Sequence, residues 1–186
     1  LLVLAIIALL AASAVPNCLE AQVRSKVSRA RADMRSLATA LESYAVDTNH
    51  YPLAELVTDP TGFDHHVMLV GQITTPVSYI TSAEAFKDPL KKGTVYDDPR
   101  CFNYEYMSYD YFIHEGNEAG GDWFRRTYGN WRLVCAGADG WVFNRDINGP
   151  DGGGAFHTIT YDPTNGTISV GDIYRTSNDP EFVKEY

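Results

Sequence analysis

The first 52 residues read LLVLAIIALLAASAV (1–15) and PNCLEAQVRSKVSRARADMRSLATALESYAVDTNHYP (16–52), and they decide the fold. The first stretch carries no charge. The second repeats apolar residues mostly at steps of three and four, which places them on one side of a helix. These residues are Val23, Val27, Ala30, Met34, Leu37, Ala38, Leu41, Tyr44 and Ala45. A single helix from Leu1 to Asp47 would span roughly 70 Å, more than the diameter of a small domain, so much of it must protrude.

Three interpretations fit the apolar run from Leu1 to Val15. A secretory signal segment would end at a small-residue site such as Ala11–Ala14 and then be removed. A buried core helix would need apolar neighbours on every side. A membrane span needs roughly 20 residues, so the run would then be a span shortened at its N-terminal end. We favour this third interpretation, because the helix continues in the same sense beyond the run and the chain begins with Leu rather than Met.

The boundaries of the second helical stretch are marked by residues with strong local preferences. Pro16 interrupts a helix because it removes one backbone hydrogen bond and clashes with the preceding turn. Asn17 is predicted to cap the helix that follows, since its side chain accepts from free backbone N–H groups. The step Asn49-His50-Tyr51-Pro52 is predicted to end the helix.

Past Pro52, turn residues alternate with short runs of aromatic and β-branched residues. We expect strands at Phe102–Met107, Tyr109–His114, Trp131–Cys135, Trp141–Asn144, Thr158–Tyr161 and Thr167–Val170, a short helix at Ser82–Phe86 and a hairpin loop at 162–167. The prediction is an α+β fold in which a small antiparallel sheet packs on the second half of the long helix. Its three segments are an apolar helix (1–16), an amphipathic helix (17–49) and a β-rich head (50–186).

Three stretches resemble type IV pilin-like proteins, in particular the major pseudopilins of type II secretion. The Pro-Asn-x-x-x-Ala-Gln step at 16–22 and the Asn-His-Tyr-Pro exit at 49–52 resemble the family most strongly. Weaker likenesses lie at 74–89 and at 136–167. Cys18 stands where family members usually carry an aromatic residue. The family's N-terminal Phe or Met, and the Glu of its apolar run, would lie upstream of Leu1.

The resemblance implies a structural subunit of a helical filament, either a type IV pilus or a type II secretion pseudopilus. Such a subunit sits in the inner membrane beside the assembly machinery, then joins other copies of itself in a periplasmic or cell-surface filament. The implied filament-core residues are Leu1, Leu4, Ile6, Ile7, Leu9, Leu10, Val15 and Pro16. The resemblance also implies an extended segment within Ala8–Pro16; a simple kink at Pro16 is the alternative.

The charge of the chain is unevenly distributed. The formal net charge is −9, and residues 97–186 hold fifteen acidic and seven basic residues. This balance argues against nucleic-acid binding by the head. The basic residues of the helix either pair with acidic surfaces of adjacent subunits or form a solvated face. They are Arg24, Lys26, Arg29, Arg31 and Arg35.

The three cysteines suggest one disulfide. Disulfides persist in oxidising compartments, and Cys101 and Cys135 both lie in the strand-rich part, where a bond would contribute roughly 3–4 kcal/mol. Cys18 is expected to be a small buried apolar residue. The chain contains no Cys-x-x-Cys-His motif for haem attachment, so a multihaem carrier is excluded.

The Asp- and Gly-rich C-terminal third offers oxygen ligands for a cation. Calcium takes six to eight oxygens in flexible geometry, and major pseudopilins commonly carry a calcium site in this region. The candidate ligands are Asp139, Asp146, Asn148 and Asp151. A solvated acidic loop is the alternative, because the spacing departs from the family's usual one.

The sequence contains no recognisable catalytic motif. Gly-x-Ser-x-Gly, His-Glu-x-x-His and the phosphate-binding Gly-Lys-Ser/Thr pattern are all missing. A structural, non-enzymatic role is therefore expected, with no required cofactor. The alternative is a membrane-tethered secreted binding or adhesin domain, stabilised by calcium, whose helix serves only as a tether.

Overall fold

The computed structural model describes most of the chain. The described residues are 2–58, 65–69, 71–81, 87–92, 102–140, 142, 159–166, 169 and 171–181; of these, the side chains of 4–11, 13, 56–58 and 65–68 are not described. The predicted elements Ser82–Phe86, most of Trp141–Asn144 and most of Thr167–Val170 lie outside the described residues.

The helix α1 (Leu2–Thr48) is continuous through Pro16. The predicted break is therefore wrong for the isolated chain, as is the cap at Asn17, which lies inside the helix. Ala, Leu, Arg and Glu dominate the flanking sequence and favour the helix, which keeps its conformation although an interior proline costs ~3 kcal/mol. The predicted C-terminal end is confirmed, because Asn49 takes a left-handed conformation (φ 62°) and donates its backbone N–H to Ala45.

Within the described residues, five antiparallel strands form one sheet in the order of the chain. The pairing is most extensive at β4, which pairs through four residues with β3 and through four with β5. Leu133 of β4 lies opposite both Tyr106 and Arg175. The link from β2 to β3 is the single pair Met68–Glu105. The strands are β1 (Glu55–Thr58), β2 (His65–Met68), β3 (Glu105–Ser108), β4 (Trp131–Cys135) and β5 (Ile173–Thr176).

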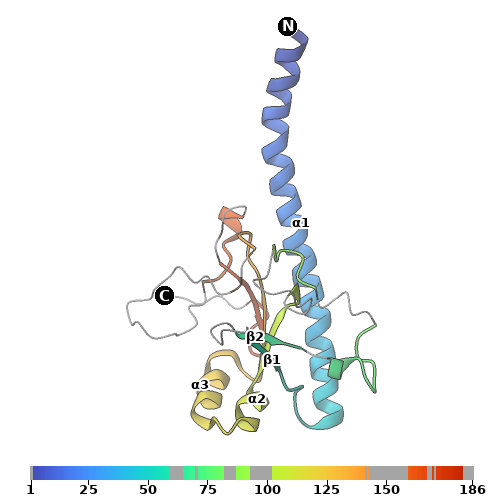
Figure 1. The fold of residues 1–186 in the computed structure, drawn as a ribbon, viewed down its shortest axis with the longest axis vertical. Coiled ribbons are helices and arrows are strands. Elements are labelled where there is room, and N and C mark those ends of the chain that lie inside the picture. The colour runs from blue at the N-terminus through green and yellow to red at the C-terminus, as the bar shows by residue number, and fades with distance from the viewer. Residues whose placement is uncertain are drawn as a thin grey trace.

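The sheet packs on the second half of α1, as the sequence predicts. The buried side chains of α1 include Val27, Ala30, Met34, Leu37, Ala38 and Leu41, which recur at steps of one, three and four. They share one core with Tyr104, Tyr106, Leu133 and Ile173 from the sheet and its flanks. Figure 1 shows the consequence: the first half of α1 projects beyond the head.

The segment Tyr109–His114 is a helix, α2, and the predicted strand there is wrong. Ser108 caps it, because its hydroxyl oxygen accepts from the backbone N–H of Tyr111. The helix α3 (Glu118–Tyr128) follows α2, and the sequence pattern does not predict it. The rings of Phe112 and Phe124 pack with centroids 5.2 Å apart, so α2 and α3 form a hairpin between β3 and β4.

Other short elements differ from the sequence-based expectation. β3 begins three residues later than predicted, whereas β4 has the predicted bounds. The predicted strand at Thr158–Tyr161 is reduced to a single parallel bridge between Thr160 and Asp172. The predicted loop at 162–167 contains a short 3-10 turn, η4 (Pro163–Asn165), capped by Asp162. A further 3-10 turn, η1 (Gly71–Ile73), lies against α1.

Candidate assembly interface

The projecting half of α1 exposes apolar side chains. Leu2 and Val3 are 76% and 67% exposed, and Val15 and Leu19 are 56% and 55% exposed. Pro16 and Cys18 are also exposed, so the expectation that Cys18 is buried is wrong for the isolated chain. Contiguous exposed apolar surface marks a site of interaction with a protein or a membrane. This half of α1 is therefore a candidate interface.

For most of the remaining filament-core candidates, the structure describes only the backbone. Leu4, Ile6, Ile7, Leu9 and Leu10 lie in α1, but their side chains are outside the described part of the chain, as is all of Leu1. Within the described residues, the search for a helix with a stretch long and apolar enough to cross a membrane found none. The membrane role of residues 1–16 stays a prediction.

The second half of α1 is fixed to the head by aromatic donors and helix carboxylates. Trp131 and Tyr51 donate to the two carboxylate oxygens of Glu42, over 2.7 and 2.9 Å. Tyr79 donates to Asp47 over 2.8 Å. Hydrogen bonds to charged acceptors are stronger than neutral ones. These contacts set the direction in which the first half of α1 projects.

The same contacts change the acidity of the phenols. The hydrogen bond to Asp47 is the main cause that raises the pKa of Tyr79. Burial raises the pKa of Tyr51, and its hydrogen bond to Glu42 adds to this effect. Both shifts favour the neutral phenol, which is the form that donates.

Asp88 is a buried carboxylate that joins the segment 87–92 to the end of β4. It accepts from the backbone N–H groups of Ala136 (2.7 Å) and Leu90 (2.8 Å) and from the thiol of Cys135 (3.2 Å). Burial raises the pKa of Asp88, and these hydrogen bonds oppose the rise. Nearby, Lys91 and Glu105 form an ion pair of 3.4 Å with both side chains 3% exposed. The step Asp88-Pro89 is typical of a turn, and no other sequence signal marks Asp88 as a buried acceptor.

Cys135 is completely buried and has a free thiol. Burial raises its pKa well above the usual range, so it is not a reactive thiolate. Its predicted partner Cys101 lies outside the described residues. The disulfide between these two residues stays a prediction.

The calcium prediction falls almost wholly outside the described structure. Asp139 follows β4, but Asp146, Asn148 and Asp151 are not described. In the part of the chain that is described, no three acidic, histidine or cysteine side chains are placed to hold a metal ion. The calcium site therefore also stays a prediction.

The arrangement of a long helix on a small sheet has a counterpart among known families. A family model described as type II secretion system (T2SS), protein G, matches residues 17–118, more than half of the chain. The chain belongs to this family. Searches of curated proteins and of solved structures found no match. The family is one of structural pseudopilins, and its members act in a secretion machine as parts of a multi-subunit filament.

The match to protein G of type II secretion ends where the α2–α3 hairpin is half complete. It covers α1 from Asn17, the strands β1 to β3, all of α2 and the first residue of α3. The rest of α3, β4 and β5 lie beyond it. The family match therefore includes α1 from Asn17, but it gives no information on residues 1–16, most of α3, β4 or β5.

Proposed function

We propose that this chain is a subunit of a type II secretion pseudopilus, in which copies pack through the first half of α1. The observation that carries the proposal is the division of α1 into a half buried against the head and a projecting half with exposed apolar side chains. Leaving that surface in water costs ~25 cal/mol per Å². Packing the helices of several copies side by side removes the cost.

Before assembly, the apolar half of α1 holds the subunit in the inner membrane, beside the assembly machinery. Transfer from lipid to a helix bundle brings little hydrophobic gain, so close packing and polar pairing must favour the filament. Membership of the protein G family supports a filament in the periplasm rather than an extended surface pilus.

The test replaces Leu9 and Leu10 together by Asp in the full-length protein in its native cell. We expect loss of filaments, because two carboxylates in the middle of a helix bundle are desolvated without partners. The measurement is electron microscopy of sheared or periplasmic material, normalised to the amount of subunit. The matched control replaces Val46 and Val77, which are 83% and 53% exposed on the head side, by Asp.

Normal filaments in the Leu9/Leu10 variant would refute packing through α1. Purified wild-type protein that stays monomeric under all assembly conditions would favour the alternative, a tethered binding or adhesin domain. A deletion of the secretion ATPase separates the two kinds of filament, because a pseudopilus depends on the type II machine.

A further inference from the structure

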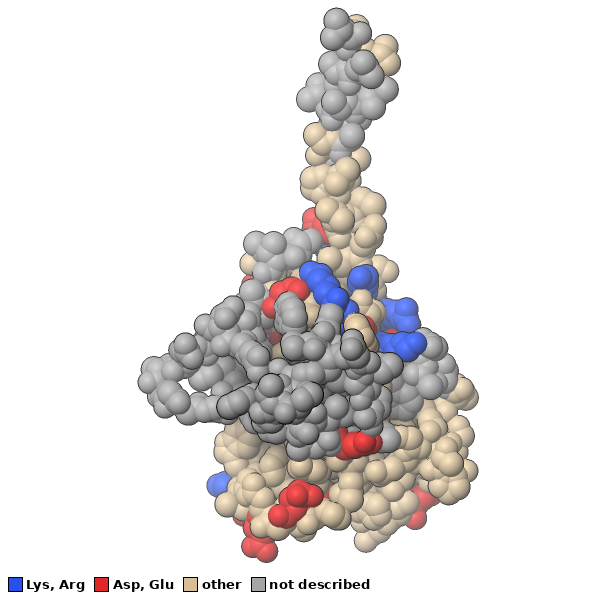
Figure 2. All heavy atoms as spheres, in the orientation of Figure 1, with Lys and Arg blue, Asp and Glu red and all other residues tan. Residues whose placement is uncertain are grey.

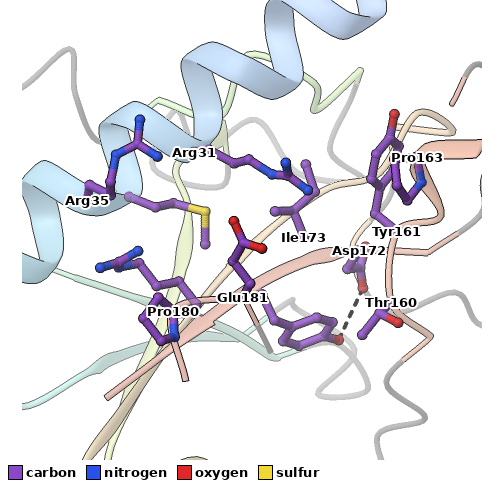
Figure 3. Close-up of a pocket in the computed structure, with 12 residues that line it drawn as sticks. Arg31, Arg35, Thr160, Tyr161, Pro163, Asp172, Ile173, Pro180 and Glu181 are labelled. Atoms are coloured by element: carbon purple, nitrogen blue, oxygen red, sulfur yellow. Dashed lines mark hydrogen bonds between the residues drawn. The ribbon is translucent and has the colours of Figure 1, made fainter. Parts of the chain in front are cut away.

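A groove between α1 and β5 is lined by three arginines, and we call it the arginine groove (Figure 3). Its volume is about 400 Å³. Arg31 and Arg35 come from α1, one helical turn apart, and Arg175 comes from β5. Apolar side chains, including Met34 and Ile173, complete the lining. Figure 2 shows the basic residues gathered where α1 meets the head.

The arginine groove keeps a net positive charge, because three arginines and two acidic residues, Asp172 and Glu181, line it. No ion pair joins Arg31, Arg35 or Arg175 to a described acidic side chain. The Nε of Arg175 is buried and has no hydrogen-bond partner within the described residues. The neighbouring arginines differ: Arg24 pairs with Glu20, and Arg29 pairs with Asp33. The groove is therefore suited to a carboxylate from outside the subunit.

The α2–α3 hairpin carries a matching pair of carboxylates. Glu118 and Asp122 are exposed, lie four residues apart on α3, and form no ion pair with a described residue. Residues at this spacing lie side by side, with Cβ atoms ~5–6 Å apart, as Arg31 and Arg35 do on α1. The nearby Arg125 is held over the ring of Tyr109 at 4.9 Å.

The α2–α3 hairpin and the arginine groove lie at different levels along α1. Figure 1 shows the hairpin at the end of the head where α1 finishes, whereas the groove lies against Arg31 and Arg35, before that end. From Arg35 to Thr48 the helix rises ~20 Å. Two parallel copies displaced by about this distance would bring the hairpin of one level with the groove of the other.

We propose that the arginine groove binds Glu118 and Asp122 of a second copy of this chain. The contact rests on the proposed filament and specifies one of its surfaces. The exposed guanidinium groups of Arg31 and Arg35 repel one another, and two incoming carboxylates relieve that repulsion. Paired charges of this kind set the register between subunits more than the total affinity.

The test is a charge exchange in the full-length protein. Arg31→Glu with Arg35→Glu should reduce filament yield roughly tenfold, because carboxylates then face carboxylates. Adding Glu118→Arg and Asp122→Arg should restore the yield to within about twofold, because the pairing is reversed but complete. Lys26→Glu with Arg29→Glu is the control, since it makes the same change of charge on exposed positions of α1. It also removes the pair of Arg29 with Asp33, but a surface ion pair of this kind contributes little to stability.

A thiol pair gives an independent reading of the same contact. Arg35→Cys and Glu118→Cys, placed in a Cys18→Ser background, should give crosslinked ladders in filaments. Each single cysteine should not. An unchanged filament yield in Arg31→Glu/Arg35→Glu would overturn the groove contact and leave the pseudopilus proposal standing. Filaments of the Arg35→Cys/Glu118→Cys protein that give no crosslinked ladder would do the same. A protein that never forms filaments would overturn both.

Discussion

At the scale of the single residue, three buried donors converge on the carboxylate of Asp88. Truncation to Ala leaves the N–H groups of Leu90 and Ala136 without an acceptor and removes one of the two acceptors of the Cys135 thiol. A buried unsatisfied group costs about 1–3 kcal/mol, so we expect Asp88→Ala to lower the free energy of unfolding by ~2–4 kcal/mol. Denaturant titration measures the change. A loss below ~0.5 kcal/mol, the usual effect of a surface substitution, would contradict it.

The same residue also predicts a dependence on pH. Burial raises the pKa of Asp88, so the folded state holds its proton more tightly than the unfolded state. The contribution of Asp88 to stability is then greatest at low pH and falls as the pH rises from the unfolded pKa through the folded pKa. We expect the stability of the wild type relative to Asp88→Asn to decrease over this interval. A difference that grows with pH there would show that hydrogen bonding outweighs burial.

At the scale of the element, the helix α2 depends on Ser108. Its hydroxyl accepts from the N–H of Tyr111 and donates to the carbonyl of Pro52, and it is fully buried. Loss of an N-cap costs ~0.5–2 kcal/mol, so Ser108→Ala should lower the free energy of unfolding by about that amount. Ser36→Ala is the control, because Ser36 is exposed on α1. Equal thermal midpoints for the two variants would contradict a capping role.

The elements also differ in how well the sequence predicts them. The buried face of α1 follows from the helical spacing of its apolar residues, and the bounds of β4 follow from a short run rich in aromatic and β-branched residues. Tyr109–His114 is rich in aromatic and β-branched residues like a strand, but the cap at Ser108 and packing against Phe124 select a helix. The strands β1 and β5 are too short for a pattern to mark them. The approach of Arg175 to α1 is a tertiary contact, so no sequence signal places it near Arg35.

At the scale of the whole molecule, only the second half of α1 packs on the head. We therefore expect the two halves of α1 to differ in how strongly their amide hydrogens are protected from exchange. Residues 27–41 pack one face against the head, so their amide hydrogens should exchange mainly when the head opens. Residues 14–22 are exposed on a helix without neighbours, so their amides should exchange much faster in the solubilised monomer. In filaments the exchange of residues 14–22 should slow, because helices from other copies cover them.

Hydrogen exchange with peptide-level detection on monomer and filament measures this difference, and β4 serves as the internal reference because it is buried in both states. If amide exchange slows in filaments only in residues 14–22, around Arg31 and Arg35, and around Glu118 and Asp122, both the packing through α1 and the arginine-groove contact are supported. Equal exchange of residues 14–22 in monomer and filament would mean that copies meet only through their heads. The exposed apolar half of α1 would then serve attachment alone, because a helix that fills the filament core cannot exchange as if it were free.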